Sequence, residues 1–284
     1  MSDFPQRAGA RITPITRKLI EKFQSYVVRQ YYEKSPKWRH SRQLIQEVAE
    51  SFARHSHSMV PPVNPIATAK LLGLTLEFRK GVANDPCGRI VPMQGGFQAT
   101  IFRATDDPTI ENRARFTIAH ECGHVLFFSL DDPLPHRIIP RASGNGGLFW
   151  REEGLCDSFA GALLMPRNLL EETPPKLDRV DVLFSLASRF QVSTEVVVRR
   201  VLHDLRLWDM NVIYRVGSKD GAVSVTIYRG SCRKSYRDPA PTGNRLAAKL
   251  NENSSCNLLG QLMHTLGVCE ECIGFKGGSH WVIV

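Results

Sequence analysis

Two histidines and a glutamate lie close together in the string His120-Glu121-Cys122-Gly123-His124, which has the form H-E-x-x-H. On a helix, residues i and i+4 lie one above the other, so the two imidazoles can reach one metal ion. The glutamate between them is displaced by about 100° and can reach a water molecule bound to that ion. The flanking residues are apolar and predict a buried helix, in which two histidines without partners would be costly. The pattern therefore favours a zinc site over a pair of hydrogen-bonded core histidines.

A catalytic zinc ion usually has three protein ligands and one open position, so a third ligand is expected from another buried helix. The apolar segment EEGLCDSFAGALLM begins with Glu152 and Glu153 and also contains Asp157. Glu153 and Asp157 share a helical face, so one carboxylate can bind the metal while the other accepts a hydrogen bond from a ligand imidazole. We therefore predict that Glu153 joins His120 and His124 as a zinc ligand. The alternative is a group of surface acids at a helix N-terminus.

These residues define a mechanism for peptide hydrolysis. Zinc would lower the pKa of a bound water molecule toward about 7 and take the developing oxyanion. Glu121 would remove the proton from this water and deliver it to the leaving amine. Glu152 is followed four residues later by a cysteine, a poor acceptor, so we expect Glu152 to be dispensable for metal and activity. His136, in the loop between the two motifs, is a weak candidate for stabilising the oxyanion, because a lone loop histidine most often has no such role.

RFTIAHECGHVLF, followed downstream by E-x-x-x-D-x-F-A-x-x-L-L-M-P, resembles the ImmA/IrrE family of gluzincin-type metallopeptidases. NPIATAKLLGLTLEF resembles the helix and strand that lead into the family's core, and LASRFQVSTEVVVRRVL resembles the helical pair that follows it. The likeness covers roughly residues 60–205. Two departures are Cys122 in place of the usual aliphatic residue and Cys156-Asp157 in place of the usual Ala-Asn. Asp157 can still accept hydrogen bonds, and the matched E-x-x-x-D string begins at Glu153.

The resemblance implies an α+β fold with a zincin-like metallopeptidase core, in which a small mixed sheet accompanies the active-site helices. It also implies a zinc-dependent endopeptidase that cleaves a specific regulatory protein, such as a transcriptional repressor, often under stress or in mobile elements. No amino-terminal repressor-like DNA-binding domain of the kind that some relatives carry is recognisable in residues 1–60.

Apolar periodicity, prolines and glycines predict the elements that position these residues. The expected helices cover residues 14–33 after a cap at Thr13, a stretch capped by Ser41, a short helix ending at Gly73, 111–129, 152–165 and a pair over 178–206. Alternating patterns predict strands in LTLEF, GRIVPM and GFQATIF, and later in NVIYRV, AVSVTIYRG and HWVIV. We expect GFQATIF to be an edge strand that could accept an extended substrate. The stretch from Leu130 to Trp150 is expected to be an irregular loop.

Breaks in these patterns predict four regions, the first boundary lying in the proline-rich stretch SHSMVPPVNP. They are a basic helical N-terminal segment (1–60), a zinc metallopeptidase core (61–175), a helical pair packing on the core (176–208) and a small C-terminal α+β region without an assigned role (209–284). The last region could be a sensing or docking module.

The composition limits the class of protein. The 284 residues are 42% hydrophobic, and 37 lysines and arginines outnumber 28 acidic residues for a net charge of +9. This excludes a disordered chain and a disulfide-stapled miniprotein, and no apolar run approaches the roughly 18–20 residues that a membrane span requires. The N-terminus lacks the apolar core of a secretory signal, and the seven cysteines form no dense framework. We therefore expect a cytoplasmic protein with reduced thiols.

The basic balance suggests a second function. Residues 1–60 have a local net charge of +6 with interleaved aromatic residues, which could bind nucleic acid, although a solvated basic face is the interpretation we favour. The alternative to a peptidase is thus a nucleic-acid-binding or stress-response regulator with a non-catalytic metal site. Glu121 argues against it, because a structural zinc site has no need of a general base. The pair over 180–205 could be a DNA-reading helix-turn-helix, but a packed hairpin is favoured.

The chain contains one further group of metal-binding residue types. Cys269 and Cys272 form a C-x-x-C string near Cys256 and His264. Four such residues could bind a second zinc ion, but the spacing matches no standard zinc finger, so unbound thiols are favoured.

Overall fold

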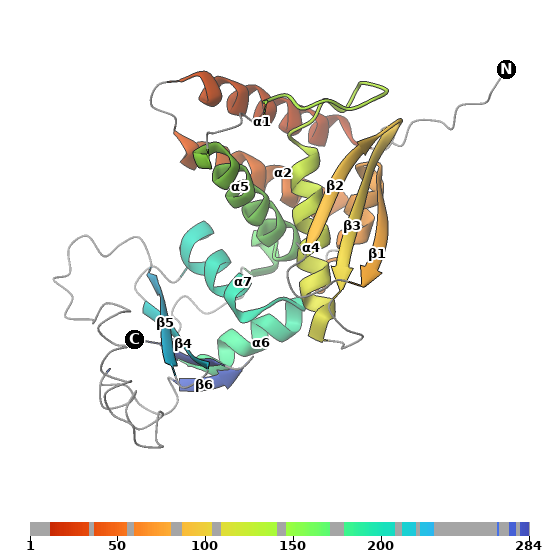
Figure 1. Cartoon of the computed structure of the whole chain (residues 1–284). Helices are drawn as coiled ribbons and strands as arrows, with labels where there is room; N and C mark the ends of the chain where they lie inside the picture. The colour runs from red at the N-terminus through yellow and green to blue at the C-terminus, as the bar shows by residue number, and fades with distance from the viewer. Residues whose placement is uncertain are drawn as a thin grey trace. The chain divides into compact units, whose positions relative to one another are not determined.

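The structure is a computed structural model that describes residues 12–33, 37–55, 60–80, 87–103, 109–140, 146–170, 179–207, 212–219, 222–229, 266, 273–276 and 279–283. The chain divides into two compact units, Met1–Glu171 with Phe190–Val192, and Glu172–Arg189 with Ser193–Val284. Each unit combines helices with one small sheet, as Figure 1 shows, which confirms the predicted α+β class.

The N-terminal helices pack within the first unit through apolar stripes. Helix α1 (Pro14–Tyr32) begins at the predicted cap, where Oγ1 of Thr13 accepts a hydrogen bond from the Thr16 amide at 3.3 Å. Helix α2 (Trp38–His55) packs on α1 and on α5, and the rings of Phe52 and Phe159 lie 6.4 Å apart. The predicted cap at Ser41 is wrong, because α2 begins three residues earlier and buries Ser41 within it.

A three-stranded sheet lies beside these helices. Its strands are β1 (Leu74–Lys80), β2 (Gly88–Met93) and β3 (Gly96–Arg103), in the order β1-β3-β2. Strand β3 runs parallel to β1 and antiparallel to β2, with a turn at Gly95, whose φ is 82°. GFQATIF is therefore the central strand, and the prediction that it is an edge was wrong because sequence order does not determine strand order. Strand β2 is the edge that packs beside helix α4 (Figure 1).

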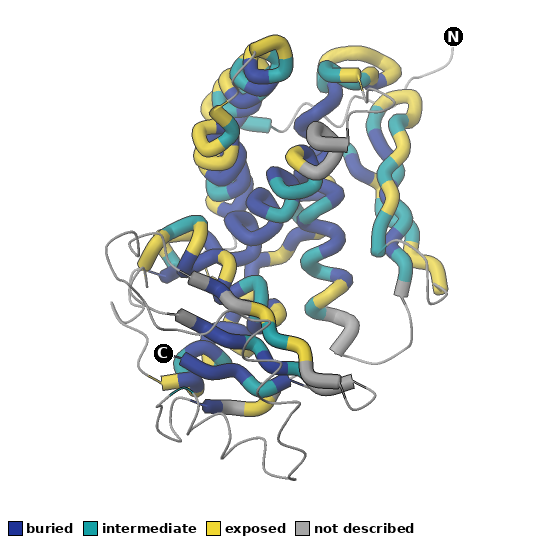
Figure 2. The backbone as a smooth tube through the Cα atoms, turned by 60° about the vertical axis from the view of Figure 1, so that its left-hand side comes forward, coloured by how far each residue is buried: buried dark blue, intermediate teal, exposed yellow. Residues whose placement is uncertain are grey.

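The two motif helices form the interior of this unit. Helix α4 (Thr109–Val125) packs on α3 (Pro65–Leu71), on the sheet and on α5 (Gly146–Leu164). Figure 2 shows that α4 and α5 are largely buried where they meet. The predicted ends differ: α4 stops at Val125 because the next three amides bond to carbonyls three residues back, which tightens the chain into a turn. Helix α5 starts at Gly146, inside the predicted loop. Glycine has a low helix propensity, so the sequence did not indicate a helix start at this position.

A glycine sets how closely the motif helices approach. A Cβ atom added at Gly123 would lie 3.0 Å from Cα of Cys156 and 3.2 Å from its Cβ. Any larger residue at position 123 would therefore push against the backbone of α5, which cannot move aside as a flexible side chain can. This close contact brings the head of α5 within reach of the two histidines.

The second unit contains α6 (Val180–Phe190, apart from its last residue), α7 (Thr194–Val198) and a π-helical segment, Arg199–Asp204. Its sheet has the order β5-β4-β7-β6, all antiparallel, from the strands β4 (Val212–Lys219), β5 (Ala222–Arg229), β6 (Ile273–Lys276) and β7 (Ser279–Ile283). The strands predicted in NVIYRV, AVSVTIYRG and HWVIV are thus present as β4, β5 and β7. The four-region division and the packing of residues 176–208 on the core stay predictions.

The second group of metal-binding residue types, Cys256, His264, Cys269 and Cys272, lies outside the described residues. Among the helices that are described, none has both the length and the apolar character needed to cross a bilayer.

Candidate functional site

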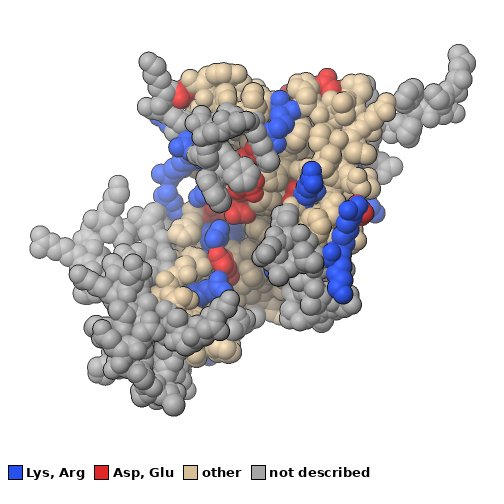
Figure 3. Space-filling view, in the orientation of Figure 1, with Lys and Arg blue, Asp and Glu red and all other residues tan. Residues whose placement is uncertain are grey.

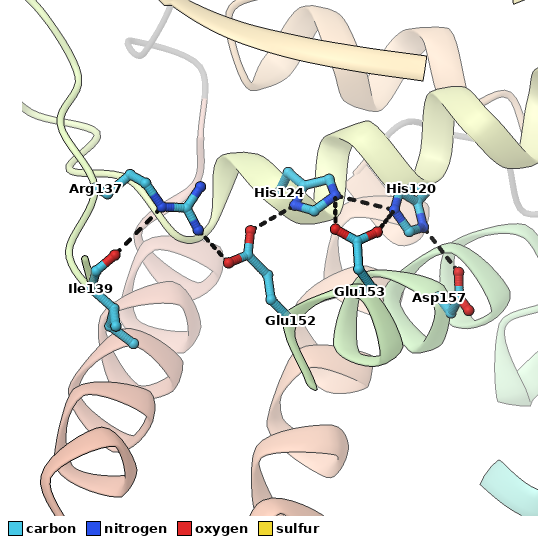
Figure 4. A network of polar contacts seen from close by, with 7 residues as sticks. All are labelled: His120, His124, Arg137, Ile139, Glu152, Glu153 and Asp157. Carbon is cyan, nitrogen blue, oxygen red and sulfur yellow. Dashed lines mark hydrogen bonds and ion pairs between the residues drawn. The ribbon is translucent and has the colours of Figure 1, made fainter. Parts of the chain in front are cut away.

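The two histidines of α4 and one glutamate of α5 turn their polar atoms toward one point (Figure 4). Nε2 of His120 lies 3.1 Å from Nε2 of His124. Glu153 places Oε2 3.1 Å from Nε2 of His120 and Oε1 3.5 Å from Nε2 of His124. A tetrahedral zinc ion with ligands at about 2.0–2.1 Å would hold its ligand atoms roughly 3.3 Å apart. The donor types and their separations therefore fit a zinc ion.

The outer nitrogen of each imidazole is held by a carboxylate. Nδ1–H of His120 donates to Oδ1 of Asp157 at 3.0 Å, and Nδ1–H of His124 donates to Oε1 of Glu152 at 2.8 Å. Each bond keeps the proton on Nδ1 and leaves Nε2 as the metal-facing atom, in the arrangement typical of metal-binding histidines. Asp157 thus occupies the position in which the sequence predicted an acceptor.

Glu152 has a role that sequence reasoning missed. It is only 8% exposed, and besides His124 it binds the guanidinium of Arg137. Arg137 also donates to the Ile139 carbonyl (Figure 4), and its guanidinium lies over the ring of Phe128 at 5.0 Å. The expectation that Glu152 is dispensable rested on its lacking a good partner, whereas in the structure this buried carboxylate links His124 to the loop after α4, which favours a role in supporting the metal ligands.

The carboxylates control the charge of the site. Burial disfavours the charged imidazoles, but Asp157 and Glu153 still raise the pKa of His120 above its usual value. Burial also disfavours the charged form of His124. Its contacts with Cys156, Glu152 and Glu153 nevertheless hold its pKa well above the usual value. Against the effect of burial, hydrogen bonds from the imidazoles hold the pKa of Glu153 below its usual range. In the metal-free site the acidic neighbours thus favour protonation of both imidazoles, and the imidazoles favour the anionic form of Glu153.

The pKa of Glu152 is lowered, as is the pKa of Glu153. Burial would raise the pKa of Glu152, but His124 and Arg137 lower it to about 2. The carboxylate is therefore ionised at neutral pH and can hold both cationic partners.

Cys156 is a second donor near the histidines. Its sulfur lies within 4.8 Å of imidazole nitrogens of His120 and His124, and its side chain is completely buried. Burial raises the pKa of this thiol to about 11, which favours the neutral form in the metal-free protein. Glu153 differs because it is ionised and lines an open cavity.

A cavity of about 680 Å³ adjoins the histidines, and it is lined by Cys87, Gly88, Arg89, Ile90, Arg113, Phe116, Thr117, His120, Glu121, His124, Glu153 and Asp157. In Figure 3, acidic side chains gather over α5, and basic side chains stand over the neighbouring strands. The cavity joins the H-E-x-x-H helix to the edge strand β2, so an extended peptide could reach the imidazoles and Glu121 together.

Glu121 is 4% exposed and lies against the beginning of β2. A Cβ atom added at Gly88 would overlap both Oε1 of Glu121 and Cγ2 of Thr117. The absence of a side chain at Gly88 therefore makes room for the Glu121 carboxylate. Sequence reasoning missed this role, because a glycine in a strand is equally typical of a bulge or a tight bend.

His136 is not brought to the site. Its side chain is 71% exposed, and Nδ1 lies 3.1 Å from Oγ of Ser129 and 3.0 Å from Oδ2 of Asp132. It is absent from the lining of the cavity that holds His120 and Glu121. These contacts place it on the loop surface, away from an oxyanion at the histidines.

Comparison with known proteins agrees with the geometry of the two helices. Residues 109–202 match the Peptidase M78 family, described as the IrrE N-terminal-like domain, which confirms the resemblance and the zincin-like core predicted from the sequence. A solved structure described as a Mycobacterium tuberculosis transcriptional regulator is similar at 18% identity with a TM-score of 0.46. The match covers 76% of this chain and 62% of that one, so this chain spans less than two thirds of its length. No curated protein matches significantly.

Proposed function

We propose that this chain, whose residues 109–202 match an IrrE N-terminal-like peptidase domain, is a zinc-dependent endopeptidase. One observation carries the proposal. The two Nε2 atoms and the Glu153 carboxylate converge within 3.5 Å of one another at the wall of a cavity that Glu121 also lines. Metal donors and a buried candidate base are thus side by side in a space that a peptide can enter.

We assign the third metal donor to Glu153 rather than Cys156. The oxygens of Glu153 lie at 3.1 and 3.5 Å from the two Nε2 atoms, near the separation that tetrahedral ligands require. Glu153 also borders the cavity, where the open position of a catalytic ion has to face. Cys156 is completely buried between the helices and contacts Gly123, so it serves the packing of α4 on α5.

The residues of this chain then have separate tasks in hydrolysis. A zinc ion, when bound, supplies Lewis acidity that acidifies a water molecule and polarises the scissile carbonyl. Glu121 accepts the proton of the attacking water on its carboxylate and delivers it to the leaving amine. Asp157 and Glu152 hold the imidazoles in orientation through Nδ1–H, so that the donor atoms need not reorganise during the reaction.

The substrate is proposed to be a specific regulatory protein, such as a transcriptional repressor, on the basis of the family resemblance. Strand β2 offers a way to bind it. Among the described strands, none pairs with the outer edge of β2, and Gly88, Arg89 and Ile90 from this strand line the cavity. An extended segment of the substrate can add to that edge through main-chain hydrogen bonds. We place the reaction in the cytoplasm.

Coexpression tests this function directly. The chain is produced together with repressors encoded near its own gene, and each repressor is followed by mass spectrometry. We expect one repressor to be cut at one or a few sites, with cleavage lost on chelation and restored by zinc. Cleavage that continues unchanged in the presence of chelator, or digestion of arbitrary unfolded proteins at a similar rate, would contradict the proposal.

A second function is favoured by one specific surface. Lys18, Lys22 and Arg29 are exposed on α1, on the side away from its buried stripe. This basic face could bind nucleic acid, as expected for a regulator with a non-catalytic metal site. Salt-sensitive binding to nucleic acid in a protein that cleaves no repressor would favour this alternative. The position of Glu121 in the cavity favours the peptidase, because a structural metal site does not need it.

A further inference from the structure

Arg113 lines the same cavity as Glu121, two turns earlier on α4. Residues 113, 117 and 121 are spaced by four and form one stripe of the helix, and Oγ1 of Thr117 donates to the Arg113 carbonyl at 2.9 Å. Arg113 is an exposed residue, and its Nη2 donates to Sγ of Cys87 at 2.7 Å. Cys87 directly precedes β2, so this contact holds a cation at one end of the cavity.

The contact leaves most of the guanidinium available. A thiol is a weak acceptor, and it occupies one of the five N–H donors of an arginine side chain. Within the described ranges of the chain, it is the one polar partner that the structure gives this side chain. Of the three acids that line the cavity, Glu153 and Asp157 bind the imidazoles, and Glu121 lies against Gly88. The cation therefore keeps donors for an incoming group.

We propose that Arg113 forms a subsite for an acidic side chain of the substrate, an assignment that rests on the peptidase function proposed above. A guanidinium binds a carboxylate through two parallel N–H donors, which gives geometric selectivity as well as attraction. Eight residues of helix separate Arg113 from Glu121, which corresponds to about 12 Å along the axis. An extended peptide advances about 3.4 Å per residue, so the acidic residue lies roughly three or four positions from the scissile bond.

Peptide binding to a chain that cannot cleave tests this subsite. The probes are N-acetylated, C-amidated decapeptides with a neutral fluorophore, in which one glutamate is moved along an otherwise uncharged sequence. Each has a glutamine counterpart, and binding to the zinc-supplemented Glu121→Gln chain is measured by fluorescence anisotropy. At one position we expect glutamate to bind about three- to tenfold more tightly than glutamine, as for a partly exposed charged hydrogen bond.

Further variants in the same background identify the residue responsible. Arg113→Met should abolish the preference for glutamate, Arg113→Lys should keep part of it, and Arg113→Glu should turn it into a preference for the glutamine counterpart. Arg79→Met is the matched control, because it removes an exposed arginine of β1 that pairs with Glu77, and the preference should persist there. Lack of a preferred glutamate position, or a preference that survives in Arg113→Met, overturns the subsite.

The subsite and the peptidase function can fail independently. Repressor cleavage by the wild-type chain decides the peptidase function. If cleavage occurs but the peptides show no acidic preference, only the subsite is wrong. If an Arg113-dependent preference is found without any cleavage, the acid-binding site stands and the proposed reaction does not.

Discussion

The two imidazoles of the site are supported in different ways. His120 donates to Asp157, whose side chain is 39% exposed, whereas His124 donates to Glu152, whose side chain is 10% exposed. Glu152 in turn binds Arg137, which lies over Phe128, so the His124 side is a buried network, whereas the carboxylate on the His120 side is partly open to solvent.

This difference indicates which of the two imidazoles is held more rigidly. Hydrogen bonds between charged groups are stronger where water is excluded, and breaking a buried charged network leaves a partner without compensation. Loss of Glu152 would remove the carboxylate that Arg137 pairs with from a position that water does not reach easily. At Asp157, whose side chain is partly exposed, water can take the place of the carboxylate. We therefore expect the His124 side to contribute more to metal affinity than the His120 side.

Removing the residue that the two sides share should have the largest effect. Glu153→Ala deletes the carboxylate that contacts both imidazoles, so zinc and activity should be lost together. The loss of zinc affinity should exceed the roughly 100-fold upper range for outer carboxylates. Competition against a chelator of known affinity measures it. Full zinc retention in this variant would transfer the third-donor role to another residue.

Two matched alanine variants separate the His124 side from the His120 side. Glu152→Ala and Asp157→Ala should each weaken zinc binding by about 10–100-fold, with Glu152→Ala at the upper end and Asp157→Ala at the lower. The same chelator competition gives both values, and the free energy of unfolding of each metal-free variant shows whether the fold persists. Equal losses, or a larger loss for Asp157→Ala, would show that burial does not rank the two sides.

Protons should compete with zinc at both sides. The pKa values of His120 and His124 are raised in the metal-free protein, so a fraction of the molecules carries a protonated imidazole at each position at neutral pH. These imidazoles must lose a proton when the metal binds. Zinc affinity should therefore rise with pH, by up to about tenfold per pH unit for each proton released. Calorimetry in buffers of different ionisation enthalpy counts these protons. Proton uptake on zinc binding would contradict the sign.

A substitution in the edge strand β2 should reduce cleavage without changing zinc binding by His120 and His124. Gly88→Ala places a Cβ against Oε1 of Glu121 and Cγ2 of Thr117 and so displaces that carboxylate, while neither imidazole is among the three nearest neighbours of the added atom. Cleavage should fall by about tenfold or more, within the usual contribution of a general base, and zinc affinity should stay within about twofold of wild type. Parallel measurement of turnover and zinc content checks this separation. Gly95→Ala, whose Cβ has no neighbour within 4 Å, controls for glycine replacement in the same sheet, although its positive φ adds local strain.

The sequence predicted the parts of the site that depend on spacing within one helix. His120 and His124 are one turn apart on α4, and Glu153 and Asp157 are one turn apart on α5, so helical geometry alone places each pair on one face. The helices themselves followed from apolar periodicity, although the ends of α4 and α5 differ from the predicted ones.

The remaining parts depend on contacts between distant segments. Arg137 lies in an irregular loop, and no spacing rule connects it to Glu152. The order β1-β3-β2 is likewise a property of strand pairing, so the edge strand was assigned to the wrong segment. Gly88 and Arg113 acquire their positions only when β2 packs beside α4.

The proposed reaction requires Glu121 to act as the base beside a metal that it does not bind. Zinc content and repressor cleavage are therefore compared in wild-type protein and Glu121→Gln. We predict about one zinc per chain in both proteins, as expected for one set of three donors, and an unchanged melting temperature. Cleavage should fall by about 10²–10⁴-fold in the variant, the usual contribution of a general base. A Glu121→Gln protein that binds zinc and still cleaves at the wild-type rate would contradict this role.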